Sequence, residues 1–228
     1  MRRGLLPSLE QAEEAVAAGK VLVSGSIAAK SSRLVGPGEP IELAGDPMPY
    51  VSRGGVKLAA ALDAFGIDVS GYRCLDVGAS TGGFTDCLLQ RGATTVVAVD
   101  VGRGQLDWSL RNDARVEVLE RTDVREADDI GRVDLVVCDV SFISLRTVMP
   151  SLVRLASGTP LVVLVKPQFE VGRRNVGKGG VVRDPALHTQ AVDGVVAAAE
   201  AHGLHAIACC RSPIEGAEGN REFFVYIR

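Results

Sequence analysis

The chain has 228 residues, enough for one full α/β domain with a small appended domain but tight for two large domains. Hydrophobic residues make up 46% and aromatic residues only 4%, so the core must be aliphatic, as in sheets of buried parallel strands. The net charge of -3 excludes a strong general attraction for nucleic acid, so any such contact must come from local basic patches.

The first 45 residues are predicted to form a small α+β domain, with one helix followed by short strands. The segment KVLVSGSIAAK, residues 20–30, has the pattern of two strands joined by a turn at Ser24 and Gly25. We refer to residues 1–45 as the N-terminal block.

A linker is predicted over residues 46–51, where Pro47 and Pro49 stiffen the chain, and the second domain covers residues 52–228. Helices and strands alternate in this domain. The predicted helices are residues 52–66, 144–156 and 184–203. The predicted strands are short apolar runs at residues 74–80, 95–101, 116–120, 133–140, 161–166, 205–212 and 222–228. Repeated βα units favour a doubly wound parallel sheet, and the last two runs predict one antiparallel strand at its edge.

Neither a membrane span nor a disulfide framework is indicated. No run approaches the roughly 20 apolar residues that a spanning helix needs, and the first residues lack the apolar stretch of a signal peptide. The five cysteines form no C-x-x-C pair and there is no histidine cluster, so we expect a reduced, cytoplasmic protein without a metal site.

A glycine-rich segment, LDVGASTGGF, lies at the end of the first strand of the predicted sheet, at the position that faces the ligand crevice of doubly wound folds. Gly78, Gly82 and Gly83 allow the backbone to turn sharply and to approach a ligand. Asp100 ends the next strand, where a carboxylate can hold ribose hydroxyls, and Asp123 follows the third strand, near the expected position of an adenine amino group. The pattern predicts a nucleoside-type cofactor, although the glycines and Asp100 alone also fit a dinucleotide.

Four charged residues are candidates for a catalytic group. Asp139 ends the fourth strand and Lys166 ends the fifth, so both are predicted to point into the cofactor crevice. Lys57 on the preceding helix and Glu222 at the start of the last strand are placed to join them. A lysine at the end of a buried strand is costly unless it is paired or used, and burial lowers its pKa.

A basic glycine-rich segment, VGRRNVGKGGVVRD, follows the fifth strand and is well placed for phosphates beside the predicted crevice. Its basic residues are Arg173, Arg174, Lys178 and Arg183, and Arg53 next to Lys57 would extend the patch. In the N-terminal block acidic and basic residues balance, so its basic side chains count only if they share one face.

Motifs spread from Tyr50 to Arg228 resemble the TlyA (hemolysin A) family, whose second half is similar to the FtsJ-like ribose 2′-O-methyltransferases. These motifs are VSRGGVKL, LDVGASTGGFT, VDVGRGQLDWSLRND, LVVCDVSFISL, VLVKPQFEVG, KGGVVRDP and EGNREFF. The segments RRGL and AAGKVLVSG resemble the family's S-four-type RNA-binding domain, here expected to lack roughly its first helix.

The resemblance implies a Rossmann-like methyltransferase fold with a mostly parallel seven-stranded sheet, and S-adenosylmethionine as cofactor. It implies a catalytic tetrad of Lys57, Asp139, Lys166 and Glu222. Lys166, with a pKa lowered by burial and by the neighbouring Lys57, would take the proton from a ribose hydroxyl. The acidic members would orient the lysines and the hydroxyl.

The same resemblance implies the binding residues and the substrate. The cofactor-binding residues would be Asp76, Gly78, Ala79, Ser80, Thr81, Gly82, Gly83, Phe84, Asp100, Val101, Asp123, Val124 and Asp139. The RNA-binding residues would be Arg2, Arg3, Lys20, Lys30, Arg53, Arg173, Arg174, Lys178 and Arg183. The substrate would be a cytidine ribose of ribosomal RNA within a ribosomal subunit. The alternatives are a membrane-active hemolysin, as the family's older name suggests, and an NAD(P)-dependent oxidoreductase.

Overall fold

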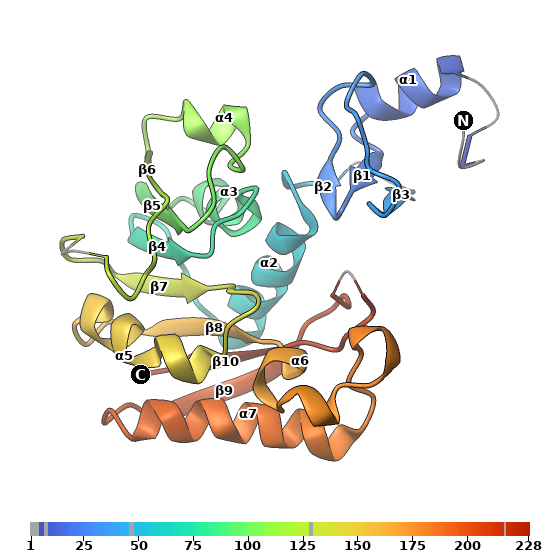
Figure 1. The fold of residues 1–228 in the computed structure, drawn as a ribbon. Coiled ribbons are helices and arrows are strands. Elements are labelled where there is room, and N and C mark those ends of the chain that lie inside the picture. Colours follow the sequence, from blue (N-terminus) through green and yellow to red (C-terminus); the bar gives the residue numbers. More distant parts are fainter. Residues whose placement is uncertain (1–4, 7–8, 46–47, 128–129, 217) are drawn as a thin grey trace.

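The computed structural model describes residues 5–6, 9–45, 48–127, 130–216 and 218–228. The N-terminal block contains one helix and a three-stranded antiparallel sheet in the order β2-β1-β3 (Figure 1). Its elements are α1 (Leu9–Ala17), β1 (Val21–Val23), β2 (Ser26–Ile27) and β3 (Ile41–Leu43). Ser24 and Gly25 form the turn between β1 and β2 with φ angles of 51° and 82°, because two-residue hairpins require positive φ. The third strand, Ile41–Leu43, lies outside the segment 20–30 in which the sequence predicted two strands.

The second part of the chain forms the predicted seven-stranded sheet, with strand order β6-β5-β4-β7-β8-β10-β9. Its strands are β4 (Arg73–Val77), β5 (Thr95–Asp100), β6 (Val116–Glu120), β7 (Leu135–Cys138), β8 (Leu161–Val165), β9 (Ala206–Arg211) and β10 (Phe223–Ile227). The strands from β6 to β8 pair in parallel, and β10 pairs antiparallel with both β8 and β9. The fold class predicted from the sequence is confirmed, except that the antiparallel strand lies second from the edge.

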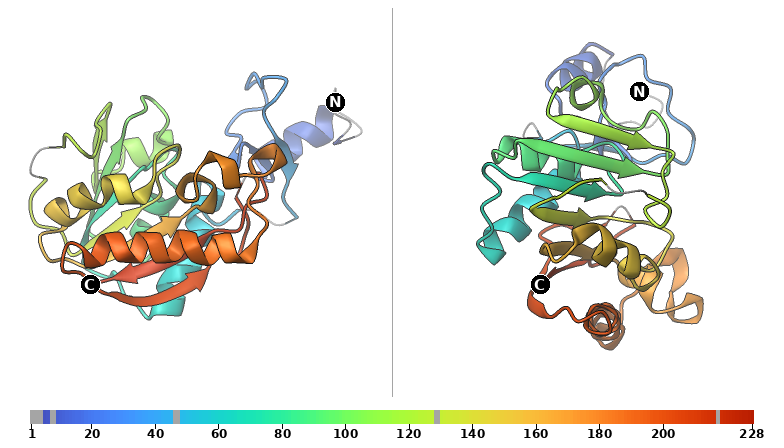
Figure 2. Two further views of the ribbon diagram at one scale, coloured as in Figure 1. Left: turned by 60° about the horizontal axis from the view of Figure 1, so that its bottom comes forward. Right: turned by 90° about the vertical axis from the view of Figure 1, so that its left-hand side faces the viewer.

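Helices cover both faces of this sheet, so the strands are buried on both sides (Figure 2). The helices are α2 (Arg53–Phe65), α3 (Gly83–Gln90), α4 (Trp108–Arg111), α5 (Leu145–Ala156), α6 (Pro167–Glu170) and α7 (Pro185–Glu200), with 3-10 turns η1 (Arg173–Asn175) and η2 (Lys178–Gly180). Side chains of α2 and α3, such as Leu58 and Leu88, pack on one face. Side chains of α5 and α7, such as Leu152 and Val195, pack on the other. The strand residues between them are aliphatic, as the composition predicted.

The strand order brings distant parts of the sequence together at the side of the sheet where the parallel strands end, and we call this side the carboxyl edge. In a parallel sheet the carboxyl ends of β4, β5, β7 and β8 lie at the same edge. Because β10 runs antiparallel to β8 and pairs Phe223 with Val165, its first residues lie at that edge as well. Glu222 therefore lies close to Lys166, although 56 positions separate them in the chain.

Candidate active site

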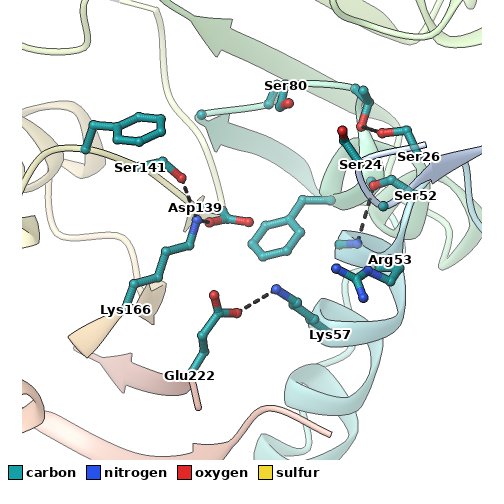
Figure 3. Close-up of a pocket in the computed structure, with 18 of the residues that line it drawn as sticks. Ser24, Ser26, Ser52, Arg53, Lys57, Ser80, Asp139, Ser141, Lys166 and Glu222 are labelled. Atoms are coloured by element: carbon teal, nitrogen blue, oxygen red, sulfur yellow. Dashed lines mark hydrogen bonds and ion pairs between the residues drawn. The ribbon is translucent and has the colours of Figure 1, made fainter. Parts of the chain in front are cut away.

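The four tetrad residues form two ion pairs at the carboxyl edge, the side of the sheet where the parallel strands end (Figure 3). They are Lys57, Asp139, Lys166 and Glu222. Lys57 Nζ lies 2.5 Å from Glu222 Oε2, and both side chains are almost fully buried, with exposures of 9% and 3%. Lys166 Nζ lies 2.5 Å from Asp139 Oδ1, with side-chain exposures of 12% and 21%. The structure therefore brings together the four charges that the sequence predicted.

Local sequence explains how Lys57 reaches the site. Ser52 caps α2, because its Oγ accepts a hydrogen bond from the amide of Gly54. Lys57 follows within the first two turns and projects from α2 towards Glu222 (Figure 3). A charge in such a buried position requires a partner, and Glu222 supplies it.

The lowered pKa predicted for Lys166 is wrong for this structure. Burial alone does lower the pKa of Lys166, but the charge of Asp139, its hydrogen bond and the charge of Glu222 together raise it above its ordinary value. Lys57 does not oppose this effect with a free charge, because it is paired with Glu222. The prediction from the sequence took account of the charge of Lys57. It left out the charges of Asp139 and Glu222, which raise the pKa of Lys166.

A cavity of about 320 Å³ contains the tetrad, and we call it the tetrad cavity. Besides the tetrad it is lined by the cofactor-binding candidates Gly78, Ala79, Ser80, Thr81, Gly83 and Phe84, and by Arg53. The turn at Ser24–Ser26 of the N-terminal block lines its rim (Figure 3). The N-terminal block and the rest of the chain therefore both contribute to one cavity.

A second cavity, also of about 320 Å³, lies beside the first, and we call it the Asp100 cavity. Asp100 accepts hydrogen bonds from the amides of Ser80 at 2.8 Å and Gly102 at 2.7 Å, which fix its carboxylate at the end of β5. The predicted residues Val101, Asp123 and Val124 also line it. The two cavities share Gly78, Ser80, Asp139, Ser141 and Phe142, so groups bound in them would meet at Asp139.

Gly78 is required by its backbone conformation and by its surroundings. Its φ is +82°, and a Cβ atom there would overlap the backbone carbonyl oxygen of Asp139. The absence of a side chain thus allows the end of β4 to lie directly against the end of β7. This close approach places the two cavities side by side.

Asp76 and Gly82 line neither of these cavities as the described residues form them. Asp76 is fully buried on β4, where it accepts a hydrogen bond from Thr85 at 2.7 Å. Burial raises the pKa of Asp76 to about 7, and the hydrogen bond from Thr85 only partly opposes this. A Cβ atom at Gly82 would overlap the side chains of Leu106 and Leu110, so Gly82 has a packing role.

Asp123 lies in the Asp100 cavity but is already engaged. Arg125 bonds it through two nitrogens, and these hydrogen bonds hold the pKa of Asp123 below its usual range. Both side chains are partly exposed, so the pair contributes little to stability. The carboxylate remains able to accept a further donor, which is the role that the sequence predicted.

The predicted RNA-binding residues occupy two regions. Arg173, Arg174, Lys178 and Arg183 are exposed on the segment between β8 and α7. Arg53 lies at the tetrad cavity and pairs with Glu42 at 3.3 Å. In the N-terminal block, Lys30 is exposed and Lys20 is partly buried. Arg2 and Arg3 lie outside the described residues.

Ser141, Phe142 and Phe169 line the tetrad cavity but were not among the site residues predicted from the sequence. Ser141 Oγ accepts a hydrogen bond from Lys166 Nζ at 2.8 Å. Phe142 is 92% exposed where the two cavities meet, with a left-handed φ of +67°, and its ring lies 5.4 Å from that of Phe169. The available signal was their position directly after Asp139 and Lys166 at strand ends, where ligand-binding side chains gather.

The fold is that of Rossmann-like methyltransferases. A solved magnesium protoporphyrin IX methyltransferase from Synechocystis, with bound SAH, is 15% identical and matches 77% of this chain and 81% of its own with a TM-score of 0.53. Likeness at that level of identity shows the fold alone, and it agrees with the fold predicted from the sequence.

Sequence comparisons define the family. The 16S/23S rRNA (cytidine-2′-O)-methyltransferase TlyA of Mycobacterium tuberculosis is 53% identical over 100% of this chain and 87% of that relative. A solved Streptococcus thermophilus protein assigned as a hemolysin is 41% identical, covers 99% of this chain and 84% of that one, and has a TM-score of 0.80. The pattern of FtsJ-like methyltransferases matches residues 50–228. The chain belongs to the FtsJ-like methyltransferase family, in the group that includes TlyA.

Family membership favours a methyltransferase over the NAD(P)-dependent oxidoreductase that the glycines and Asp100 left open. As for the hemolysin alternative, none of the helices in the described part of the chain has the length and hydropathy needed to cross a membrane.

Proposed function

We propose that this protein transfers a methyl group from S-adenosylmethionine to the ribose 2′-hydroxyl of a cytidine in ribosomal RNA. The observation that carries the proposal is the meeting of two cavities at Asp139, one of which contains the paired tetrad. Such an arrangement suits the transfer of a group between two ligands bound side by side. The TlyA relative, whose name specifies cytidine 2′-O-methylation of 16S and 23S rRNA, supports the choice of substrate. A ribosomal RNA substrate would place the enzyme in the cytoplasm.

The Asp100 cavity fits the adenosine part of such a cofactor. Its size lies at the lower end of the range for small-molecule sites, and its lining combines valine side chains with polar side chains such as those of Asp100 and Asp123. Asp100 is fixed by two amides and is suited to accept hydrogen bonds from ribose hydroxyls. Asp123 offers an acceptor for an adenine amino group. When bound, the cofactor supplies an electrophilic methyl group on a positively charged sulfur.

Lys166 is the proposed proton acceptor. In the free protein its pKa is raised and Asp139 holds it as a cation, so it must lose a proton before it can accept one. Lys166 loses its proton more easily beside a second positive charge, such as that of a cationic cofactor bound in the Asp100 cavity. Exclusion of water by RNA over the tetrad cavity would act in the same direction, because desolvation disfavours the charged form.

The other tetrad members hold the reacting groups in place. Asp139 and Ser141 contact Lys166 Nζ from the end of β7, and they fix the direction of its lone pair once the proton has left. Glu222 and Lys57 neutralise each other, so the buried site carries no uncompensated charge beside the hydroxyl. Positioning of this kind contributes to the rate without forming a covalent bond.

RNA is proposed to bind along the basic segment after β8 and on the N-terminal block, with residues 46–51 as the linker between the two domains. Arg173, Arg174, Lys178 and Arg183 are exposed and free to contact phosphates. Phe142 and Phe169 present an aromatic surface at the tetrad cavity, and unpaired RNA bases stack on such side chains.

Labelled methyl transfer to isolated ribosomal subunits, with the modified ribose mapped, tests the proposal. We expect transfer to a cytidine 2′-oxygen, and no labelled ribose after incubation with either subunit would exclude this function. The Asp100→Ala variant should bind S-adenosylmethionine about 10- to 100-fold more weakly by calorimetry, because charged hydrogen bonds to ribose are lost. Asp113→Ala is the matched control, since this carboxylate pairs with Arg115 and lines neither cavity.

A further inference from the structure

A buried asparagine connects the basic segment to the tetrad. Asn220 is 1% exposed, and its side chain bonds in two directions to a segment far away in the sequence. Its Nδ2 donates to the carbonyl oxygen of Gly180 at 2.8 Å, and its Oδ1 accepts from the amide of Val182 at 2.9 Å. We refer to residues 171–184 as the basic loop, and it lies beside the loop that precedes β10 (Figure 1).

The basic loop depends on these bonds because it has little regular structure of its own. It contains two short 3-10 turns and several glycines, which lose much conformational freedom when they become ordered. The Val182 carbonyl accepts a further bond from Nε2 of the buried His188 at 2.8 Å. Asn220 and His188 therefore fix the middle of the loop, between the exposed Lys178 and Arg183.

On its other side, Asn220 lies two residues before Glu222 in a tightly closed turn. The Asn220 carbonyl oxygen accepts a bond from the amide of Gly216 at 2.9 Å, and Gly216 lies directly against the Glu222 carboxylate, with no room for a Cβ atom. The Glu222 carbonyl oxygen accepts from the amide of Ser212 at 2.9 Å. Glu222 then pairs with Lys57 in the tetrad cavity (Figure 3).

We propose that Asn220 is a positioning residue that aligns Glu222 with the basic loop, so that an RNA strand held by the loop meets a correctly placed tetrad. This inference rests on the proposed function, because it assumes that the loop binds RNA phosphates and that the tetrad performs methyl transfer. Asn220 is too deeply buried to touch RNA, and it acts through Glu222 on one side and through the loop on the other.

Displacing Glu222 has a consequence that simple loosening of the fold would not produce. The charge of Glu222 is one of the causes that raise the pKa of Lys166, against the opposing effect of burial. If Glu222 moves away, Lys57 also loses its partner and its positive charge acts on Lys166. Both changes lower the pKa of Lys166, so the acid limb of the rate profile should move to lower pH.

The test compares Asn220→Ala and Asn220→Ser with Asn112→Ala in the full chain. Asn112 is the control, because its side chain also donates to a backbone carbonyl oxygen, that of Trp108 at 2.7 Å, and it lies outside the basic loop and lines neither cavity. Single-turnover methyl transfer to ribosomal subunits is measured at saturating cofactor and RNA, from pH 6 to 10, alongside calorimetric cofactor binding and thermal unfolding.

We expect both Asn220 variants to lose about 10- to 100-fold in single-turnover rate, as small misplacements of catalytic groups do. Their acid limb should move to lower pH, with cofactor affinity within about twofold of wild type and Asn112→Ala unchanged. The serine variant retains a polar side chain if alanine prevents folding. An unchanged rate and pH profile in a folded Asn220 variant overturns the inference, even if its KM or melting temperature changes. An inactive wild type overturns the proposed function and this inference with it.

Discussion

The two parts of the molecule differ in how they are held together. The catalytic part has aliphatic clusters on both faces of its sheet, and each contains large, fully buried side chains such as Leu58 and Leu152. In the described residues of the N-terminal block, the comparable cluster consists of Val21, Val23 and Ala28. A core of that size is too small to stabilise a domain by itself. The difference implies that the N-terminal block owes part of its order to the surface on which it docks.

The docking contact is small and polar, and it lies at the edge of the active site. The amide of Ile27 donates to the Val51 carbonyl oxygen at 3.2 Å, and the amide of Arg53 donates to that of Gly25 at 3.1 Å. Ser26 Oγ donates to Thr81 Oγ1 at 3.1 Å, in the glycine-rich segment. The weakly packed part therefore touches the cofactor side of the strongly packed part. Variants in either part should show how far the stability and activity of one part depend on the other.

The largest expected effect lies in the chemistry of the catalytic part. In the Lys166→Arg variant the guanidinium group stays protonated and cannot accept the proton of the ribose hydroxyl. The variant should therefore lose about 10²- to 10⁴-fold in single-turnover rate. Cofactor and RNA affinities should stay near wild type, because a general base acts in the transition state. Rapid-quench methyl transfer and binding titrations measure the two quantities separately. A near-normal rate would show that Lys166 only orients the hydroxyl and that another group takes the proton.

Removal of residues 1–45 is expected to have the next largest effect. If the block brings ribosomal RNA to the site, methylation at low subunit concentration should fall by about 10- to 100-fold, because one of two linked binding modules is lost. Cofactor affinity should fall only a few-fold, since Thr81 loses one partner. Equal methylation with and without the block would show that the block does not bring ribosomal RNA to the active site. The isolated block should lack a cooperative unfolding transition, whereas the shortened catalytic part should retain one.

Asp76 offers a pH-dependent test that is confined to the catalytic core. Its pKa is raised from 3.8 to about 7, so between these values the folded state holds a proton that the unfolded state has released. The contribution of Asp76 to the free energy of unfolding should therefore decrease as pH rises from 4 to 7, by about 1–3 kcal/mol. Asp76→Asn should flatten this dependence, whatever its constant effect at all pH values. Urea unfolding of both proteins at pH 5 and pH 8 measures the difference, and parallel profiles would contradict a buried neutral carboxyl.

The comparison also explains which features could be predicted from the sequence. The apolar runs from Cys74 to Lys166 identified the parallel sheet, because buried strands are aliphatic throughout. Strand ends identified Asp100, Asp139 and Lys166, since parallel strands share one ligand-binding edge. The short strand at residues 41–43 carried no comparable signal, because three partly exposed residues show little periodicity.

Features that depend on pairing between distant segments were beyond sequence reasoning. The raised pKa of Lys166 depends on which carboxylates the fold brings to its Nζ atom. The role of Asn220 depends on hydrogen bonds to a loop about 40 residues away, and no local pattern marks it. Phe142 combines a left-handed backbone with an exposed ring, and no local sequence pattern marks either feature.

The smallest expected effect comes from the bond between the two parts. Ser26→Ala removes the hydroxyl that bonds to Thr81 while leaving the backbone contacts of Ile27 and Arg53 in place. The bond is only partly buried, so its loss should cost about 0.5–1.5 kcal/mol at most. If the N-terminal block is ordered by docking, that loss should appear as faster hydrogen exchange in β1 and β2, with exchange in β4 to β8 unchanged. Ser70→Ala on the catalytic part is a control, since this residue lies away from both cavities. Unaltered exchange in β1 and β2 would mean that the block is held by its own small core and the backbone contacts, and the proposed dependence on this docking contact would then be wrong.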